Sequence, residues 1–283
     1  MSKRREVEGR IASLKEIHTI MESMKNLSMM EIRKLARYHA AQQRVVDSIR
    51  LAFNSVRRHY AADLVTEEGP PVFLLLGSER GFCGAYNEQL IEELKQQPDY
   101  PQSPVIGIGT KLQAALQQAH ADAICLPGAA VADEVTAALT RAVASLNQLR
   151  RQLGPLRVEV IYFDPDRHQP RCLPALPETE NAAMTEPEPL INLPPMQLLG
   201  ELLEHYLFAL TNAWFFAALV AENQRRIQHL EQAGHHLERQ IDELGKRRNS
   251  LRQEEIIEEI EVILLSTESV SAPGMTDQAN VNR

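Results

Sequence analysis

The sequence predicts an α/β fold in which a Rossmann-like domain is inserted between two long N- and C-terminal helices that form an antiparallel coiled coil. Three observations predict it: an uninterrupted helical pattern at the N-terminus, a heptad of leucines near the C-terminus, and alternating β-rich and helical segments between them. We expect a coiled-coil helix in residues 1–62, the Rossmann-like domain with a proline-rich linker in 63–195, a second coiled-coil helix in 196–268 and a disordered tail in 269–283.

The N-terminal segment has the pattern of an amphipathic helix. Residues 10–60 contain neither glycine nor proline. Apolar residues recur in steps of three and four, the spacing of one helix face, at Val7, Ile11, Leu14, Ile17, Met21, Met24 and Leu27. A helix of about 50 residues would be roughly 75 Å long, so it needs an equally long partner.

The partner is predicted near the C-terminus, where no proline occurs between Gln197 and Ser266. A seven-residue repeat, typical of a left-handed coiled coil, places leucine at Leu230, Leu237, Leu244 and Leu251. Gly234 and Arg248 weaken this seam, and the apolar stripe shifts phase after Leu251. Part of this helix is therefore expected to face something other than the N-terminal helix.

The middle of the chain alternates strand-like and helix-like segments. The expected strands are 72–77, 105–109, 123–126 and 158–163, and the expected helices are 86–96, 111–119 and 131–153. This order predicts parallel βαβ units with helices covering the sheet. Residues 164–195 are rich in proline and are expected to form a loop or linker.

Composition indicates a folded protein and excludes some classes. The formal net charge of −8 argues against bulk binding of nucleic acid, although residues 1–60 carry 13 Lys/Arg and 6 Asp/Glu. Three widely spaced cysteines suggest reduced thiols in a cytosolic setting, and the N-terminus does not resemble a signal peptide. The apolar run 207–221 contains Asn212 and is short for a membrane span, so we expect a buried helix.

The loop GSERGFCG, residues 77–84, follows the first expected strand and raises the question of a site. It lacks the Lys-Ser/Thr of a phosphate-binding P-loop and the GxGxxG spacing. Cys83 would need a base to act as a nucleophile, and only a following helix N-terminus could lower its pKa. The structural alternative is a tight turn in which Gly81 and Gly84 adopt positive φ.

Other candidate groups give little chemistry. The adjacent His235 and His236 point to different helix faces, which does not suit a metal site. The sequence therefore predicts no catalytic, cofactor-binding or metal site. A cluster of methionines, Met24, Met29 and Met30, is either helix core or an adaptable contact surface for a partner.

Three motifs stand in order along the chain, within residues 10–24, 78–87 and 249–260. Through them nearly the whole chain, from residue 8 to about residue 267, resembles the γ subunit of F-type ATP synthases. The family motif R-I-x-S-[VL] followed by I-x-x-A-M is similar to RIASL at residues 10–14 with Ile20, Ser23 and Met24. The signature S-D-R-G-L-C-G-G-L-N is similar to SERGFCGAYN, residues 78–87, at six of ten positions. A late signature, N-x-x-R-Q-x-x-I-x-x-E-[LI], corresponds to Asn249, Arg252, Gln253, Ile256, Glu259 and Ile260.

This resemblance implies a non-catalytic central-stalk rotor that couples ion flow through the membrane sector to ATP synthesis or hydrolysis in a ring of three α and three β subunits. The implied partners are the α and β subunits, the ε subunit and the membrane c-ring, with no cofactor of its own. The implied location is the cytoplasmic face of a bacterial plasma membrane. Arg252 and Gln253 match residues that touch β-subunit loops, Met24 matches a methionine at the height of the β lever, and Asn249 is taken as a further ring contact.

The chain also departs from the family. Thr19, Glu22 and Glu31 stand where lysine is common, and Gly234, His235 and His236 replace a usual A-T-[DE]-N stretch. We hypothesise a specialised bacterial version that belongs to a second, alternate ATPase. Two other function classes stay open from the residues alone: a homodimeric coiled-coil scaffold with an α/β module, and an α/β enzyme that uses Cys83.

Overall fold

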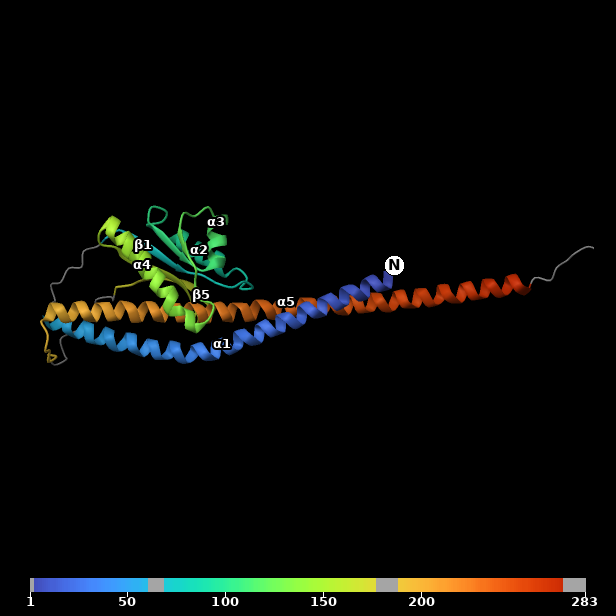
Figure 1. Ribbon diagram of the computed structural model, residues 1–283, viewed down its shortest axis with the longest axis horizontal. Helices are drawn as coiled ribbons and strands as arrows, with labels where there is room; N and C mark the ends of the chain where they lie inside the picture. The colour runs from blue at the N-terminus through green and yellow to red at the C-terminus, as the bar shows by residue number, and fades with distance from the viewer. Residues whose placement is uncertain (1–2, 61–68, 177–187, 272–283) are drawn as a thin grey trace, which may run out of the picture. The chain divides into compact units, whose positions relative to one another are not determined.

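The computed structural model describes residues 3–60, 69–176 and 188–271, with side chains as far as residue 264. Parts of the expected linker (177–187) and tail (272–283) lie outside the described residues. The chain divides into two compact units, one of residues 1–22 with 232–283 and one of residues 23–231. Figure 1 shows the two long helices, α1 (Lys3–Tyr60) and α5 (Pro195–Ser271), which contribute to both units.

The first unit is a pair of helical segments. Arg4 of α1 forms an ion pair with Glu255 of α5 over 2.7 Å, and His18 of α1 lies 3.4 Å from Glu238 of α5. Residues later in α1 therefore meet residues earlier in α5, so the pair is antiparallel, as predicted. The seam buries Val7 and Ile11 of α1, while the predicted heptad leucines from Leu237 onward are half-buried.

The second unit contains a five-stranded sheet with the strand order β3-β2-β1-β4-β5. Its strands are β1 (Pro71–Leu76), β2 (Val105–Ile108), β3 (Ile124–Leu126), β4 (Arg157–Asp164) and β5 (Gln169–Pro174). The other helices are α2 (Tyr86–Gln96), α3 (Thr110–Gln118), a short 3₁₀ helix η1 (Ala132–Glu134) and α4 (Val135–Leu153). Strands β1 to β4 are mutually parallel and β5 is antiparallel to β4. The predicted fold class is thus confirmed, with the four expected strands present.

Strand β5 corrects the expectation that residues 164–195 form only a loop or linker. Two prolines in this six-residue strand, Pro170 and Pro174, conceal it in the sequence. Ala175 N–H donates to the carbonyl of Val158, and antiparallel ladder bonds alternate from that pair. Both prolines therefore occupy positions whose N–H would point away from β4, which an edge strand tolerates.

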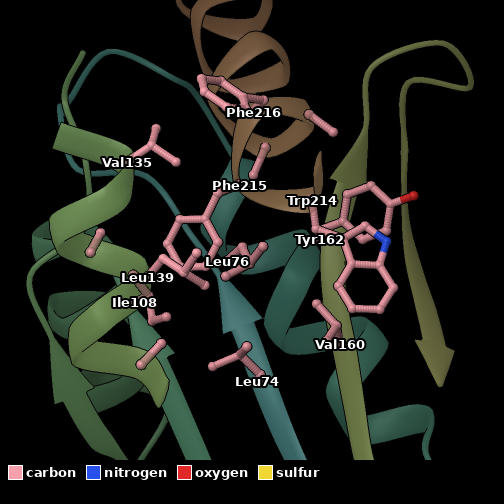
Figure 2. Close-up of a cluster of buried hydrophobic side chains, with 14 of the residues drawn as sticks. Leu74, Leu76, Ile108, Val135, Leu139, Val160, Tyr162, Trp214, Phe215 and Phe216 are labelled. Atoms are coloured by element: carbon pink, nitrogen blue, oxygen red, sulfur yellow. The ribbon is translucent and has the colours of Figure 1, made fainter. Parts of the chain in front are cut away.

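Both faces of the sheet are covered, as is usual for parallel strands. On one face, alternate β1 residues such as Leu74 and Leu76 pack with α4 and with a segment of α5, Trp214 to Val220 (Figure 2). On the other face, Phe73 and Leu75 pack with α2 and α3. The central strands are therefore apolar on both faces, which explains the continuous apolar pattern of the sequence.

Helix α5 carries the apolar run that raised the question of a membrane span. By length and composition α5 could cross a membrane, since one 18-residue window has a mean hydropathy of 1.2. Residues 213–223 of α5 are nevertheless all buried inside the second unit. Packing against the sheet thus accounts for the run, as expected from its length and Asn212.

In the second unit, α1 also packs on α5. Tyr38 of α1 stacks on Phe216 of α5 with ring centroids 5.6 Å apart. Farther along, Val46 of α1 is buried with Ala209 of α5, and Phe53 of α1 is buried in a cluster with Leu199 of α5. Helix α5 therefore has two neighbours in this unit, α1 and the sheet domain, which we define as residues 69–176.

Candidate functional site: the β1–α2 turn and the exposed helix surfaces

The turn between β1 and α2 is held by its own side chains. Ser78 N–H donates to the side-chain oxygen of Asn87 over 3.0 Å, and the Asn87 amide donates to the Ser78 hydroxyl over 2.9 Å. Gly84 has the predicted positive φ, at +59°, but Gly81 does not. The second positive φ of the turn is at Phe82, +65°, whose side chain is 53% exposed. The expectation for Gly81 is corrected: the left-handed turn begins one residue later.

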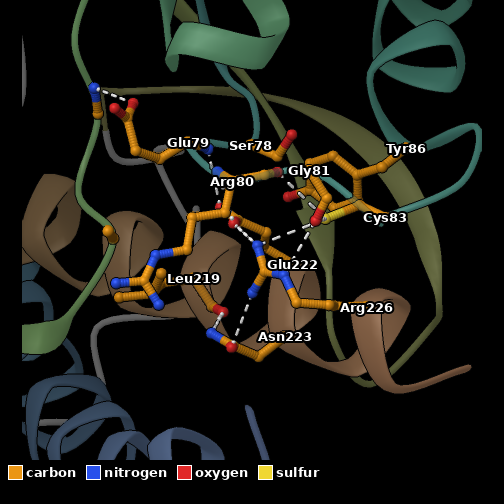
Figure 3. Close-up of polar contacts among 12 residues, drawn as sticks. Ser78, Glu79, Arg80, Gly81, Cys83, Tyr86, Leu219, Glu222, Asn223 and Arg226 are labelled. Atoms are coloured by element: carbon orange, nitrogen blue, oxygen red, sulfur yellow. Dashed lines mark hydrogen bonds and ion pairs between the residues drawn. The ribbon is translucent and has the colours of Figure 1, made fainter. Parts of the chain in front are cut away.

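Helix α5 reaches this turn with a buried carboxylate (Figure 3). Glu222, 2% exposed, accepts hydrogen bonds from the backbone N–H groups of Glu79, over 3.1 Å, and Arg80, over 3.2 Å. These two donors lie at the start of the turn, directly after β1. The carboxylate of α5 therefore satisfies backbone groups that the strand and the turn leave unpaired.

One turn of α5 later, Arg226 completes the contact. Its guanidinium, in a residue 3% exposed, forms an ion pair with Glu222 and donates to the carbonyl of Gly81 over 3.1 Å. It also donates to the side-chain oxygen of Asn223 over 2.9 Å. A further N–H points to Cys83 Sγ over 3.5 Å. The planar guanidinium thus joins two points on α5 to two points on the turn, which a lysine ammonium cannot do with the same geometry. We call Glu222 and Arg226, with the backbone of residues 79–81, the α5–turn link.

Burial governs the titration of this region. Burial raises the pKa of Glu222, while Arg226 and the two N–H donors oppose that effect. Burial, and then the charge of Glu222, raise the pKa of Cys83 to about 12. Cys83 is therefore a thiol at neutral pH and not a nucleophilic thiolate. Its Sγ lies 3.4 Å from the carbonyl oxygen of Gly81, so it is part of the packed turn.

The side chain of Glu79 connects the turn to two other parts of the sheet domain, the start of α3 and the loop after β3. Its carboxylate accepts hydrogen bonds from Thr110 N–H over 2.9 Å, the Thr110 hydroxyl over 2.6 Å and Gly128 N–H over 2.8 Å. Burial acts to raise the pKa of Glu79, but these hydrogen bonds outweigh it and lower the pKa. Thr110 is the first residue of α3, and a helix N-terminus is where α/β domains commonly bind phosphate. A carboxylate of the chain itself occupies this position.

The predicted partner-contact residues lie on the helices in different units. Asn249, Arg252 and Gln253 are exposed on α5 in the unit of paired helices. Met24 is half-buried on α1 in the unit that contains the sheet. Of the other two methionines, Met29 is half-buried and Met30 is 65% exposed.

The end of α5 carries an exposed apolar surface. Between residues 256 and 264, six large apolar side chains are each 45–66% exposed: Ile256, Ile257, Ile260, Val262, Ile263 and Leu264. Because α1 begins at Lys3 and Arg4 pairs with Glu255, this part of α5 continues past the start of α1. A concentration of exposed apolar side chains of this size marks an interaction surface.

Sequence reasoning missed Glu222 and Arg226. The signal was present: two opposite charges, four residues apart, directly follow the apolar run 207–221. Charged residues at the border of a buried helix are paired more often than not. Among the described residues no group of three His, Cys, Asp or Glu side chains is placed to hold a metal ion.

Comparison with known proteins gives consistent matches over the chain. The sequence model of a family described as ATP synthase matches residues 3–270. The ATP synthase gamma chain of Clostridium botulinum is 23% identical over 275 residues, which cover 93% of this chain and 96% of that protein. The mitochondrial ATP synthase subunit gamma of Saccharomyces cerevisiae is 26% identical over 125 residues, 43% of this chain and 40% of the yeast protein.

Solved structures share the fold. A chain of the Euglena gracilis mitochondrial ATP synthase, in a structure of OSCP, F1 and c-ring in rotational state 3, has a TM-score of 0.64 at 16% identity, covering 98% of both chains. A chain of the rotor of the same enzyme in rotational state 1 has a TM-score of 0.59, covering 89% of this chain and 98% of that one. A chain of the Tetrahymena thermophila central stalk and c-ring has a TM-score of 0.52 at 14% identity, over 76% and 99% of the two chains.

Proposed function

The chain belongs to the family of ATP synthase gamma subunits, and from this premise we propose that it is the central-stalk rotor of a bacterial F-type ATPase. It is a non-catalytic subunit, so the nucleotide chemistry belongs to other chains of the complex. The single observation that carries the proposal is the exposed apolar surface of α5 at Ile256, Ile257, Ile260 and Val262, beyond the start of α1. An apolar helix end of this kind requires a surrounding partner, and a ring of three α and three β subunits provides one.

The proposed ring contacts follow the exposed surface of the helices. Arg252 and Gln253 lie directly before the apolar end of α5, and Asn249 lies one helical turn earlier. Exposed polar side chains make contacts of low individual strength, because water competes for each of them. A rotor needs such contacts, since each must break and re-form as the shaft turns past successive β subunits. Met24, half-buried on α1, is proposed to meet the β lever.

The rotor is coupled to the ring because it shifts the populations of the β-subunit conformations. The α1–α5 pair has two unlike helices, so it presents a different surface to each β subunit around it. Each orientation of the shaft stabilises one β conformation over the others by the difference in contact free energy. Rotation then changes which β subunit is in which state, without any chemistry on this chain.

The sheet domain is proposed to contact the ε subunit and the c-ring, and the complex is proposed to lie on the cytoplasmic face of a bacterial plasma membrane. The similar Euglena and Tetrahymena chains come from structures whose names include the c-ring. We also propose that the chain serves a second, alternate ATPase. The support is the loss of lysine at Thr19, Glu22 and Glu31 and the Gly-His-His sequence from Gly234.

A homodimeric scaffold is not favoured, because the heptad leucines have a partner within the chain. Leu230 is 2% exposed, and the leucines from Leu237 to Leu251 are half-buried beside α1. A parallel homodimer would need the same surface. The exposed apolar surface of α5 at residues 256–264 lies after the heptad, so it is not part of that repeat.

Co-expression tests the proposed function. The chain is produced with the α and β subunits of an F-type ATPase from the same organism, and the purified complex is assayed for ATP hydrolysis and rotation of a bead attached to the sheet domain. We expect one copy of the chain per complex and rotation driven by ATP. A stable homodimer of the chain in light scattering, with no association with α and β, would overturn the proposal.

A further inference from the structure

Two kinds of contact join α5 to the sheet domain, and they resist different motions. The apolar segment from Trp214 to Val220 packs on the sheet and on α4. Apolar contacts are non-directional, so they oppose separation of the two parts far more than rotation of α5 about its own axis. Directional contacts are needed to hold the rotational phase of α5.

The α5–turn link supplies such contacts at the end of the apolar segment. Glu222 accepts two backbone N–H bonds from residues 79 and 80, and Arg226 donates to the carbonyl of Gly81. Glu79 in turn holds Thr110 and Gly128 through its side chain. These bonds therefore connect α5 through the turn to the N-terminus of α3 and the loop after β3. Figure 3 shows the part between α5 and the turn.

The charges of the link are expensive to bury, which argues for a role other than stability. Glu222 and Arg226 are each 3% exposed in their side chains. Taking both charges out of water costs free energy that apolar residues of the same size would not cost. A buried, hydrogen-bonded ion pair fixes one orientation of α5 against the turn. A pair of apolar residues does not.

We propose that Glu222 and Arg226 are positioning residues that fix the rotational phase of α5 relative to the sheet domain, so that the helix and the domain turn as one body. This inference rests on the proposed rotor function, because only a rotor must carry torque across this contact. The link carries torque from the membrane side out of the domain into the shaft, together with the contacts of Arg225 with Gln89, His168 and Phe163. Weakening it makes the shaft torsionally softer while the chain still folds.

The test uses a double variant, Glu222→Gln with Arg226→Met, in which no buried charge is left unpaired. The assembled complex is fixed through its β subunits, and a bead is attached to a cysteine introduced at Ala137, an exposed residue of α4. Cys125 and Cys172, which are both half-buried, are replaced by serine in every version of the chain. The angular variance of the bead without nucleotide is inversely proportional to the torsional stiffness between bead and ring.

We expect the angular variance to rise about twofold in the double variant, with a thermal unfolding temperature close to that of the parent chain. The matched control is Gln228→Met, an exposed position of α5, which should leave the variance unchanged. Arg226→Lys keeps the charge but not the planar arrangement of donors, so it should give an intermediate variance. If the double variant fails to assemble, the variance of Arg226→Lys is compared with that of the parent chain instead. An unchanged variance in a complex that still rotates would overturn the inference.

Hydrogen exchange of the isolated full-length chain separates this inference from the rotor proposal. The amides of Glu79 and Arg80 donate to different oxygens of Glu222, and a carboxamide keeps only one acceptor oxygen. At least one of these two amides should therefore exchange at least about tenfold faster in the double variant, while amides of β1 such as Leu74 keep their rates. If the parent complex does not rotate, the rotor proposal fails, and the exchange rates still decide whether the link exists. Equal exchange at residues 79 and 80 in both chains would show that no such link holds α5.

Discussion

The backbone N–H of Glu79 donates a hydrogen bond to the carboxylate of Glu222 over 3.1 Å, across 143 residues of sequence. The bond joins the turn after the first strand of the sheet domain to the C-terminal helix. It places a charged side chain where a backbone donor would otherwise be buried without a partner. The four predictions below concern this contact, its neighbours in the turn and the exposed surface of α5.

Arg226→Ala should destabilise the chain strongly. Removing the guanidinium leaves Glu222 as an unpaired buried charge, and such losses cost about 3–5 kcal/mol of the free energy of unfolding. The double variant Glu222→Gln with Arg226→Met should recover most of this loss, because it removes both charges together. Urea unfolding of the full-length chain at pH 7 measures both effects. A loss below about 1 kcal/mol for Arg226→Ala would show that the buried pair is not coupled as described.

Glu79→Gln should lower stability in a pH-dependent way. The pKa of Glu79 is lowered in the folded chain, so its charge contributes stability that is fully present above the ordinary pKa of a glutamate, about 4.3, and is lost as pH falls through the lowered value. We expect a loss of about 1 kcal/mol at pH 7, since the group is partly exposed and water screens its contacts. The difference between parent and variant should shrink below about pH 4.

Unfolding free energies measured from pH 3 to pH 8 check this prediction. The control is Glu92→Gln, an exposed position of α2, whose effect should be small at every pH. A difference for Glu79→Gln that stays constant down to pH 3 would mean that its charge is not what the hydrogen bonds stabilise.

The sequence predicted the features that one segment determines by itself, but not those that depend on contacts between distant segments. The long helices followed from periodicity and the strands from β1 to β4 from short β-rich segments, and each segment carries these signals by itself. Strand β5 was missed because Pro170 and Pro174 are tolerated only at an edge, and edge position is a property of the assembled sheet. The pairing of Glu222 with residues of the turn is equally non-local, so no local pattern could assign it.

The turn shows the same limit at the level of one residue. Glycine content predicted a left-handed conformation, and Gly84 adopts it. The other positive φ falls on Phe82 and not on Gly81, although glycine adopts it at lower cost. The guanidinium of Arg226 donates a hydrogen bond to the Gly81 carbonyl, so that carbonyl must point toward α5. This contact with α5 constrains the backbone at Gly81, and the positive φ lies one residue later, at Phe82. The local sequence does not contain that constraint.

Cys83 should be unreactive in the folded chain. With its pKa raised to about 12, the thiolate fraction at pH 8 is roughly a thousandfold below that of an ordinary cysteine. The rate of labelling by a maleimide or a disulfide reagent should fall accordingly and recover in denaturant. The rate is followed at Cys83 by mass spectrometry of digested protein. Labelling of Cys83 as fast as a model thiol would reopen the possibility of a nucleophilic site in the turn.

Arg252→Ala combined with Gln253→Ala should impair assembly or coupling and leave the fold intact. Both side chains are exposed on α5, so their removal should change the unfolding free energy of the isolated chain by less than about 0.5 kcal/mol. In the complex, the loss of polar contacts to β loops should reduce ion transport per ATP hydrolysed, or the yield of complex. The matched control is Lys246→Ala with Arg247→Ala, an exposed polar pair on the same helix two turns earlier. Equal losses of coupling or yield in both double variants would point to a general effect of surface charge. A sharp fall in the unfolding temperature of the Arg252→Ala, Gln253→Ala chain would show that these residues stabilise the fold and do not act in the ring contact.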